Sequence, residues 1–335
     1  MFWGARLPWR SLALFAVTLG VLVCYPVLIS VNMTKSVANV ATLLGVIVVF
    51  LSWRQFLASV PPSRHLAVRA FAAGLGLSTV LVMLEYNLDM PVAHIFLTLF
   101  ERPLPYLYVY DRGIVILSLL LWSLVGLLRL PLWATTLALA GVVALVQATS
   151  SQASLAGFSV GALFYLLATW RARLAQLALG TMIIAALLFM PVMCYLMPTF
   201  IDGSVDIWPA ANGASRLKIW SQTAQAIWLQ PIQGHGIEAS RYLPVVRDHI
   251  HPHNGILQLW IEFGLIGILA MIAIVISVLQ RAQLTPAAVA TAAGWLVIFC
   301  VSYNIWQPWW LAMPFILASV SQIVSPTYAA TARAV

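Results

Sequence analysis

Three alternating histidines are the residues in this sequence whose types and spacing most clearly suit chemistry. They are His249, His251 and His253, in the stretch RDHIHPHN. Alternate side chains of an extended strand share one face, so three imidazole nitrogens could bind a zinc ion. Pro252 stiffens the stretch, however, and the spacing along a strand is wider than one tetrahedral ion easily accepts. We therefore expect no metal here. A second interpretation is that all three are loop histidines without a chemical role.

The residues after His253 favour a third interpretation, in which one ring is a general base. Asn254 is a preferred N-cap residue, and GILQLWIEF continues from it as a helix. His253 would then lie just outside the helix N-terminus, where the positive end of the helix dipole disfavours the imidazolium ion. A neutral imidazole facing a cavity is what a general base requires.

Cations gather in the same part of the sequence and in one earlier segment. They are Arg112, Arg216, Lys218, Arg241 and Arg247. Guanidinium groups bind phosphate oxygens in a bidentate manner and stabilise charge on a leaving group, so together they predict a site for an anionic substrate. The alternative for any single residue is an ion pair, of Arg112 with Asp111 or Glu262, or of Arg247 with Asp248.

Composition restricts the class of protein to membrane proteins. The 335 residues are 62% hydrophobic and only 8% charged, and the mean hydropathy is +0.97, whereas about a quarter of the residues in a soluble domain are charged. No basic stripe is long enough to bind nucleic acid. The three cysteines lie within apolar runs without CxxC spacing, which argues against a disulfide framework or a thiolate metal site.

Apolar stretches long enough for a membrane helix predict an all-α, polytopic fold. We count ten spans, near residues 11–31, 36–53, 70–88, 113–128, 131–148, 152–170, 175–197, 254–280, 286–305 and 308–324. The first follows a basic N-terminus but has no small-x-small cleavage site, so we expect it to remain uncleaved. The sequence thus predicts a single integral membrane domain over residues 1–335.

The distribution of charge orients these spans. With the N-terminus inside, the cytoplasmic segments hold ten arginines: Arg6, Arg10, Arg54, Arg64, Arg69, Arg129, Arg171, Arg173, Arg281 and Arg333. All nine acids fall on the outer side or in the outer half of a span. Because cytoplasmic loops collect Lys and Arg, we expect both termini in the cytoplasm.

Two outer segments are long enough to carry function. The first, residues 87–112, is apolar but interrupted and could lie partly along the membrane interface. The second, residues 198–253, contains SRLKIWSQTAQAIWLQ, an amphipathic helix by its periodicity, with Leu217, Trp220, Ala224 and Ile227 on one face. PIQGHG then ends that helix.

Glu262 stands two turns into the helix that follows Asn254. An ionisable side chain inside a membrane helix is costly and is by default a functional or pairing residue. Gly264 and Gly267, shortly after it, suit close contact between helices.

These residues together resemble the motif of the bacterial O-antigen ligase family. That motif reads His, then Asn, Ser or Gln, nine residues, Gly, two residues, and Gly, Thr or Tyr. His253, Asn254, Gly264 and Gly267 satisfy every fixed position. SRLKIW followed by PIQGHG is similar to the superfamily's large periplasmic loop. The resemblance is specific over residues 213–270.

The resemblance implies a polytopic glycosyltransferase, with a fold like that of GT-C enzymes, that uses a polyprenyl-diphosphate-linked glycan on the periplasmic face without a metal or other cofactor. His253 matches the histidine that activates the acceptor hydroxyl, and Arg216 matches the arginine that holds the donor diphosphate. Arg112 is a weaker match. Further substrate contacts are expected from Arg241, Gln152, Asn254, Glu262 and His251.

The sequence differs from the family pattern in two respects. Family members carry an arginine at the outer start of a middle span, where TSSQASLAG places Gln152, and an amide hydrogen-bonds to phosphate without neutralising it. The chain also has ten predicted spans where about twelve are common in the family.

The predicted function is that of an inverting ligase in the bacterial inner membrane. It would move a glycan from the polyprenyl carrier to a sugar hydroxyl, with lipid A core as the acceptor and the bilayer as its environment. A polymerase of the same superfamily, whose acceptor is another lipid-linked glycan, is the nearest alternative. A transporter is a weaker one, because transporters have charges in several spans and broken helices near the midplane.

Overall fold

The computed structural model describes residues 20–59, 64–99, 111–128, 151–200, 211–243, 251–281 and 284–324. Within these ranges all regular structure is helical: η1 (Gly20–Cys24), α2 (Tyr25–Leu28), α3 (Met33–Ser59), α4 (Arg64–Asn87), α5 (Pro91–Leu99), α6 (Asp111–Leu128), α8 (Gln152–Trp170), α9 (Ala172–Phe200), α10 (Ala211–Leu229), η4 (Ala239–Arg241), α11 (Gly255–Arg281), α12 (Pro286–Val301) and α13 (Pro308–Val324). The all-α prediction is confirmed for this part of the chain.

Several helices have the length and composition of membrane spans. Five are long and apolar enough to cross a bilayer: Met33–Phe56, Leu66–Asn87, Gln152–Trp170, Ala172–Met197 and Gly255–Gln280. Large apolar side chains are also exposed, such as Val49 on α3 at 69% and Leu77 on α4 at 62%. Such exposure is unfavourable in water and favourable against lipid tails. The chain is therefore a membrane protein.

These spans agree with five of the ten expected from the sequence. α6 also falls on the stretch predicted at 113–128, and α12 and α13 are shorter apolar helices. The span predicted at 131–148 and the first part of the one at 11–31 lie outside the described residues. The total of ten, and the side of the membrane on which each loop lies, stay predictions.

The chain divides into two compact units. One comprises Met1–Gly45, Gly180–Ala282 and Phe299–Trp310, and the other Val46–Leu179, Gln283–Ile298 and Leu311–Val335. The boundaries between the units fall inside four helices, so that one end of each helix belongs to each unit: α3, α9, α12 and α13. The expectation of one integral membrane domain stays a prediction.

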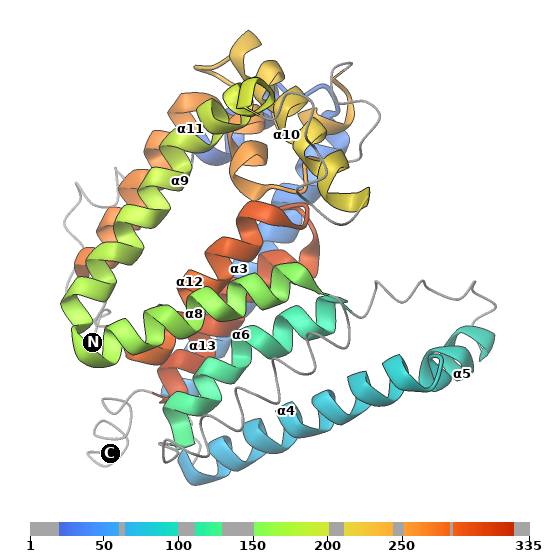
Figure 1. Ribbon diagram of the computed structural model, residues 1–335, viewed down its shortest axis with the longest axis vertical. Helices are drawn as coiled ribbons and strands as arrows, with labels where there is room; N and C mark the ends of the chain where they lie inside the picture. The colour runs from blue at the N-terminus through green and yellow to red at the C-terminus, as the bar shows by residue number, and fades with distance from the viewer. Residues whose placement is uncertain are drawn as a thin grey trace. The chain divides into compact units, whose positions relative to one another are not determined.

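The second unit is held together by close packing of helices at small residues. α6 lies beside α4 and beside α8 (Figure 1). α8 and α12 cross at Gly157 and Gly294, where a Cβ atom on either glycine would lie within 2.8 Å of the other's carbonyl oxygen. Trp122 stacks on Phe158 at a ring distance of 5.0 Å. Small residues allow this approach between helices in a membrane, where the hydrophobic effect gives no drive to associate.

Glu85, one of the nine acids, has a structural explanation in the second unit. It is buried, and its two carboxylate oxygens accept hydrogen bonds from the backbone N–H groups of Val92 and Ala93, at 2.6 and 3.2 Å. These N–H groups belong to the first turn of α5, which has no partner for them within the helix. Glu85 therefore caps α5, the short helix in the first predicted outer segment.

The first unit contains the amphipathic helix that the sequence predicts. α10 runs from Ala211 to Leu229 and packs against α11 (Figure 1). Ala224 and Ile227 are buried as predicted, whereas Leu217 and Trp220 are only half-buried. Ile219 and Thr223 are buried as well. The buried face is therefore wider than the periodicity of the apolar residues indicates, because it includes a threonine whose hydroxyl bonds back to Ile219 O at 2.7 Å.

The main irregularity of the first unit is a break inside α11. At Gly264 the backbone has φ 58° and ψ −166°, which is not helical. The segment after α10 fills the break: His235 and Gly236 donate N–H groups to Ile261 O and Glu262 O at 2.8 and 3.0 Å. In return, Leu265 and Ile266 donate theirs to Pro231 O and Ile232 O at 2.8 and 3.2 Å. Such groups must find partners within the protein, because a bilayer core supplies none.

Glycine is required at this junction for two reasons. The conformation of Gly264 lies in a region that essentially only glycine adopts. A side chain there would overlap the backbone of Ile232 and Gly234, and a Cβ atom on Gly234 would lie 2.6 Å from Glu262 O. The close contact of Gly264 is thus with the loop that follows α10, and not with another helix as the sequence suggested.

Replacing Gly264 by Ala should lower the melting temperature of the purified protein clearly. The backbone strain alone amounts to about 1–3 kcal/mol, and the added methyl group would push residues 231–237 out of the break. Gly45→Ala is a matched control, since nothing lies within 4 Å of its new methyl group inside α3. That control should melt at or slightly above the wild-type temperature, because alanine favours helix by about 1 kcal/mol. Equal melting of wild type and Gly264→Ala would contradict the docking of this loop.

Candidate functional site

His253 lies immediately before α11, in the position that the sequence predicts. Asn254 is fully buried, and its Oδ1 accepts the N–H of Leu257 at 3.0 Å. Its carbonyl oxygen accepts the N–H of Gln258, also at 3.0 Å. Asn254 is thus the N-cap of α11, as predicted. The backbone of His253 has φ +52°, a conformation that residues other than glycine rarely adopt.

The second histidine contacts the first through its ring nitrogen. The backbone N–H of His253 donates to Nδ1 of His251 at 3.2 Å, and the two ring centroids are 4.0 Å apart. Because Nδ1 accepts a hydrogen bond, the proton of the neutral ring is on Nε2. Burial, followed by the charges of His253, Arg241 and Arg216, lowers the pKa of His251 to about 3. His251 is therefore neutral at physiological pH.

Arg216 is placed by α10 beside the end of α12. Its Nη1 donates to the carbonyl oxygen of Val301 at 3.1 Å. One turn later, Trp220 Nε1 donates to Pro252 O at 2.9 Å, which ties α10 to the segment that carries His251 and His253. Since the charge of Arg216 also acts on His251, the structure brings the predicted anion-binding arginine and the predicted base into one neighbourhood.

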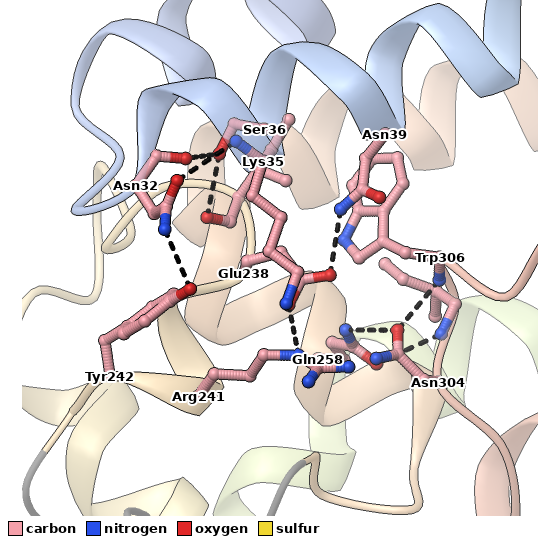
Figure 2. A network of polar contacts seen from close by, with 12 residues as sticks. Asn32, Lys35, Ser36, Asn39, Glu238, Arg241, Tyr242, Gln258, Asn304 and Trp306 are labelled. Carbon is pink, nitrogen blue, oxygen red and sulfur yellow. Dashed lines mark hydrogen bonds and ion pairs between the residues drawn. The ribbon is translucent and has the colours of Figure 1, made fainter.

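Arg241 belongs to the same group but has a partner of its own. It forms an ion pair with Glu238, a buried residue with φ +64° three positions earlier. Asn39 of α3 donates to the other carboxylate oxygen of Glu238 at 2.9 Å (Figure 2). Arg241 thus contributes its charge to the site from a position that Glu238 fixes.

Glu262 is held by neutral donors and not by an arginine. It is fully buried, and it accepts hydrogen bonds from Gln258 Nε2 at 2.9 Å and from Trp306 Nε1 at 2.6 Å. Gln258 also donates to Asn304 Oδ1 at 3.0 Å. Asn304 accepts the backbone N–H of Trp306 at 2.8 Å (Figure 2). This network fastens residues 304–306, between α12 and α13, to the first half of α11.

Two predicted substrate contacts lie in the other compact unit. Arg112 and Gln152 are exposed residues in the first turns of α6 and α8. Their role in binding stays a prediction. His249 and Arg247 lie outside the described residues. In the described part of the chain, no group of three His, Cys, Asp or Glu residues is arranged to hold a metal ion.

Comparison with known proteins agrees with the motif. Residues 135–272 match the model of a protein family described as O-antigen ligase. A candidate polysaccharide ligase of Rickettsia felis is 28% identical over 280 residues, which cover 75% of this chain and 67% of that protein. Those of Rickettsia conorii and Rickettsia typhi are 28% and 27% identical and are likewise covered over 67% of their length. Both comparisons support a relationship of this chain to the O-antigen ligase superfamily. No solved structure matches it.

The segment matched by the O-antigen ligase family contains most of the predicted site. It includes Gln152, Arg216, Arg241, His251, His253, Asn254 and Glu262. It excludes Arg112 and also residues 304–306, which complete the network around Glu262. The resemblance stated from the motif is thereby confirmed at the level of the superfamily.

Five residues of the site region were not found from the sequence: Asn39, Glu238, Gln258, Asn304 and Trp306. Gln258 had a usable signal, because it stands four residues before Glu262 and so shares its helix face. The others come from distant parts of the chain, or from a loop, and nothing in their spacing indicates that they meet.

Changing Glu262 to Gln should destabilise the protein. Both carboxylate oxygens accept N–H groups, and an amide would turn a donor toward one of them. A buried donor without an acceptor costs about 1–3 kcal/mol, so we expect a clear drop in melting temperature. Asp89→Asn, at an exposed position with φ +53°, removes one negative charge as a control and should change stability little. An unchanged melting temperature for Glu262→Gln would show that the network is not structural.

Proposed function

We propose that this protein is a glycosyltransferase that moves a glycan from a polyprenyl-diphosphate carrier to a sugar hydroxyl of an acceptor. The observation that carries the proposal is the position of His253 just outside the capped N-terminus of α11. Its ring lies next to that of His251, whose pKa the charges of Arg241 and Arg216 lower. The superfamily supports a ligase-like activity. Lipid A core is the proposed acceptor.

The positive charge near His251 suits a diphosphate. Arg216 is half-buried, its Nη1 donates to Val301 O, and its charge acts on His251. Arg241 adds a second positive charge, partly balanced by Glu238. We assign the main contact with the donor diphosphate to Arg216 and a supporting one to Arg241. Arg112 and Gln152 are further proposed contacts from the other unit.

The proposed reaction needs one base and one stabilised leaving group. His253 takes the proton from the acceptor hydroxyl while that oxygen attacks the anomeric carbon. The bond between this carbon and the phosphate oxygen breaks, and the diphosphate leaves with the electron pair, so that the anomeric configuration inverts. Arginine stabilises the charge that develops on the leaving oxygen.

The break in α11 does not by itself favour a transporter. In transporters, broken membrane helices expose backbone groups that coordinate substrates or ions. Here residues 231–236 form hydrogen bonds with two carbonyl groups before the break and with two N–H groups after it. The nearby acid, Glu262, is likewise occupied by Gln258 and Trp306. We therefore prefer the enzyme.

The proposed cellular arrangement follows from the charge distribution along the sequence. The ten cytoplasmic arginines predicted by the positive-inside rule leave residues 198–253 on the outer face. We propose a multi-pass protein of the bacterial inner membrane with a periplasmic active site. Its donor would reach the site from the outer leaflet.

Replacing His253 by Ala should lower the rate of glycan transfer by about 10²- to 10⁴-fold, which is the usual contribution of a general base. The measurement is transfer from a purified polyprenyl-diphosphate glycan to lipid A core by the protein in vesicles. Lys218→Ala is a matched control, since Lys218 is an exposed cation on α10 two residues from Arg216. Near-normal transfer by the His253→Ala protein would overturn the assignment of the base.

A deletion strain separates a ligase from a polymerase. Full-length glycan that accumulates on the carrier lipid but is absent from lipid A core, as seen by mass spectrometry, is the result expected for a ligase. Shortened glycan chains would instead show that the acceptor is another lipid-linked unit. Complementation with the Arg216→Ala gene should fail in either case, whereas the Lys218→Ala gene should restore the product.

A further inference from the structure

The turn that carries His253 is closed by a histidine side chain, that of His251. Residues 251–254 precede α11, and the N–H of His253 donates to Nδ1 of His251 two residues earlier, at 3.2 Å. This is the geometry of an Asx turn, in which Asn or Asp accepts an N–H two residues further along. Nδ1 of histidine occupies the same position relative to the backbone as Oδ1 of asparagine. His251 therefore acts here as an asparagine would.

The turn holds His253 in a conformation that needs support. A residue other than glycine at φ +52° is strained by about 1–3 kcal/mol, which the surroundings must offset. Trp220 fixes Pro252 from α10 by its bond to the carbonyl oxygen, and Asn254 fixes the other side as the N-cap. The bond to Nδ1 of His251 is the third constraint, and it acts on His253 itself.

We infer that His251 is a positioning residue for His253, acting through Nδ1 as a hydrogen-bond acceptor and not as a ligand of the substrate. This inference rests on the proposed function for its catalytic consequence, although the turn itself does not. The expectation from the sequence was that His251 contacts the substrate, which would use the other ring nitrogen, Nε2. The two roles can therefore be separated by the nitrogen that each requires.

The surroundings keep the acceptor available. Protonation of Nδ1 would remove the hydrogen bond, because an imidazolium ion has donors only. Burial and the neighbouring charges of His253, Arg241 and Arg216 hold the pKa of His251 at about 3. Glu238 pairs with Arg241 and offsets part of its charge. The ring therefore stays an acceptor over the range in which bacteria grow.

Three substitutions test the inference in the vesicle transfer assay. His251→Asn keeps an acceptor at the Nδ1 position, His251→Gln places its amide near the Nε2 position, and His251→Leu has neither. We expect the Asn variant to keep kcat within about tenfold of wild type, since one hydrogen bond is only slightly altered. The Gln and Leu variants should lose roughly 10²-fold in kcat, as a misplaced base does. KM for the donor should change little in all three.

Amide hydrogen exchange tests the turn independently of the transfer reaction. Amide hydrogen exchange at residues 251–254 should be slow in the wild type and in His251→Asn, and faster in His251→Gln and His251→Leu. If the wild type transfers no glycan but this order of exchange holds, the proposed function fails while the positioning role stands.

Three results would overturn the inference. One is rescue of kcat by Gln but not by Asn, which would show a contact through Nε2. Another is a raised KM for the donor in all variants, which would make His251 a substrate ligand. The third is equal exchange at residues 251–254 in the Asn and Leu variants.

Discussion

The break in α11 at Gly264 is the constraint on which the rest of the first unit depends. An interrupted membrane helix exposes backbone groups that the bilayer cannot satisfy. Residues 231–236 make four hydrogen bonds to backbone groups on both sides of the break, so this loop is fixed to α11. The loop continues directly into Glu238 and Arg241, and the half-helix begins at Asn254. One backbone junction therefore fixes Arg241, in its pair with Glu238, relative to His253.

The two acids of this unit that the structure describes, Glu238 and Glu262, have different kinds of partner, and the difference affects the charge of the site. Glu262 meets only neutral donors, Gln258 and Trp306, and so takes no cation away from the site. Glu238 meets Asn39 and Arg241, and it offsets part of one positive charge. Arg216 donates to a backbone carbonyl oxygen. The charges of Arg216 and Arg241 both act on His251, which suits an anionic donor nearby.

The sequence predicted what depends on neighbours along the chain. The N-cap at Asn254, the end of α10 before PIQGHG and five of the ten predicted spans follow from local propensity and hydropathy, and the structure agrees. Two members of the network around Glu262, Asn304 and Trp306, could not be predicted, because they lie more than 40 residues away along the chain and belong to a loop. Gly264 was assigned to helix packing because a small residue in an apolar helix usually has that role. Its positive φ becomes evident only with the loop in place.

The break also gives a physical reason for the spacing of the motif. Nine residues, 255–263, separate the cap Asn254 from Gly264, and they form the first half of α11. At about 1.5 Å per residue, this segment sets a distance of roughly 13 Å between His253, the proposed base, and the docked loop. One residue more or less would turn His253 by about 100° around the helix axis relative to the loop that carries Arg241. The number of residues between the histidine and the glycine is thus a helix length, and it would keep the proposed base in register with the charge of Arg241.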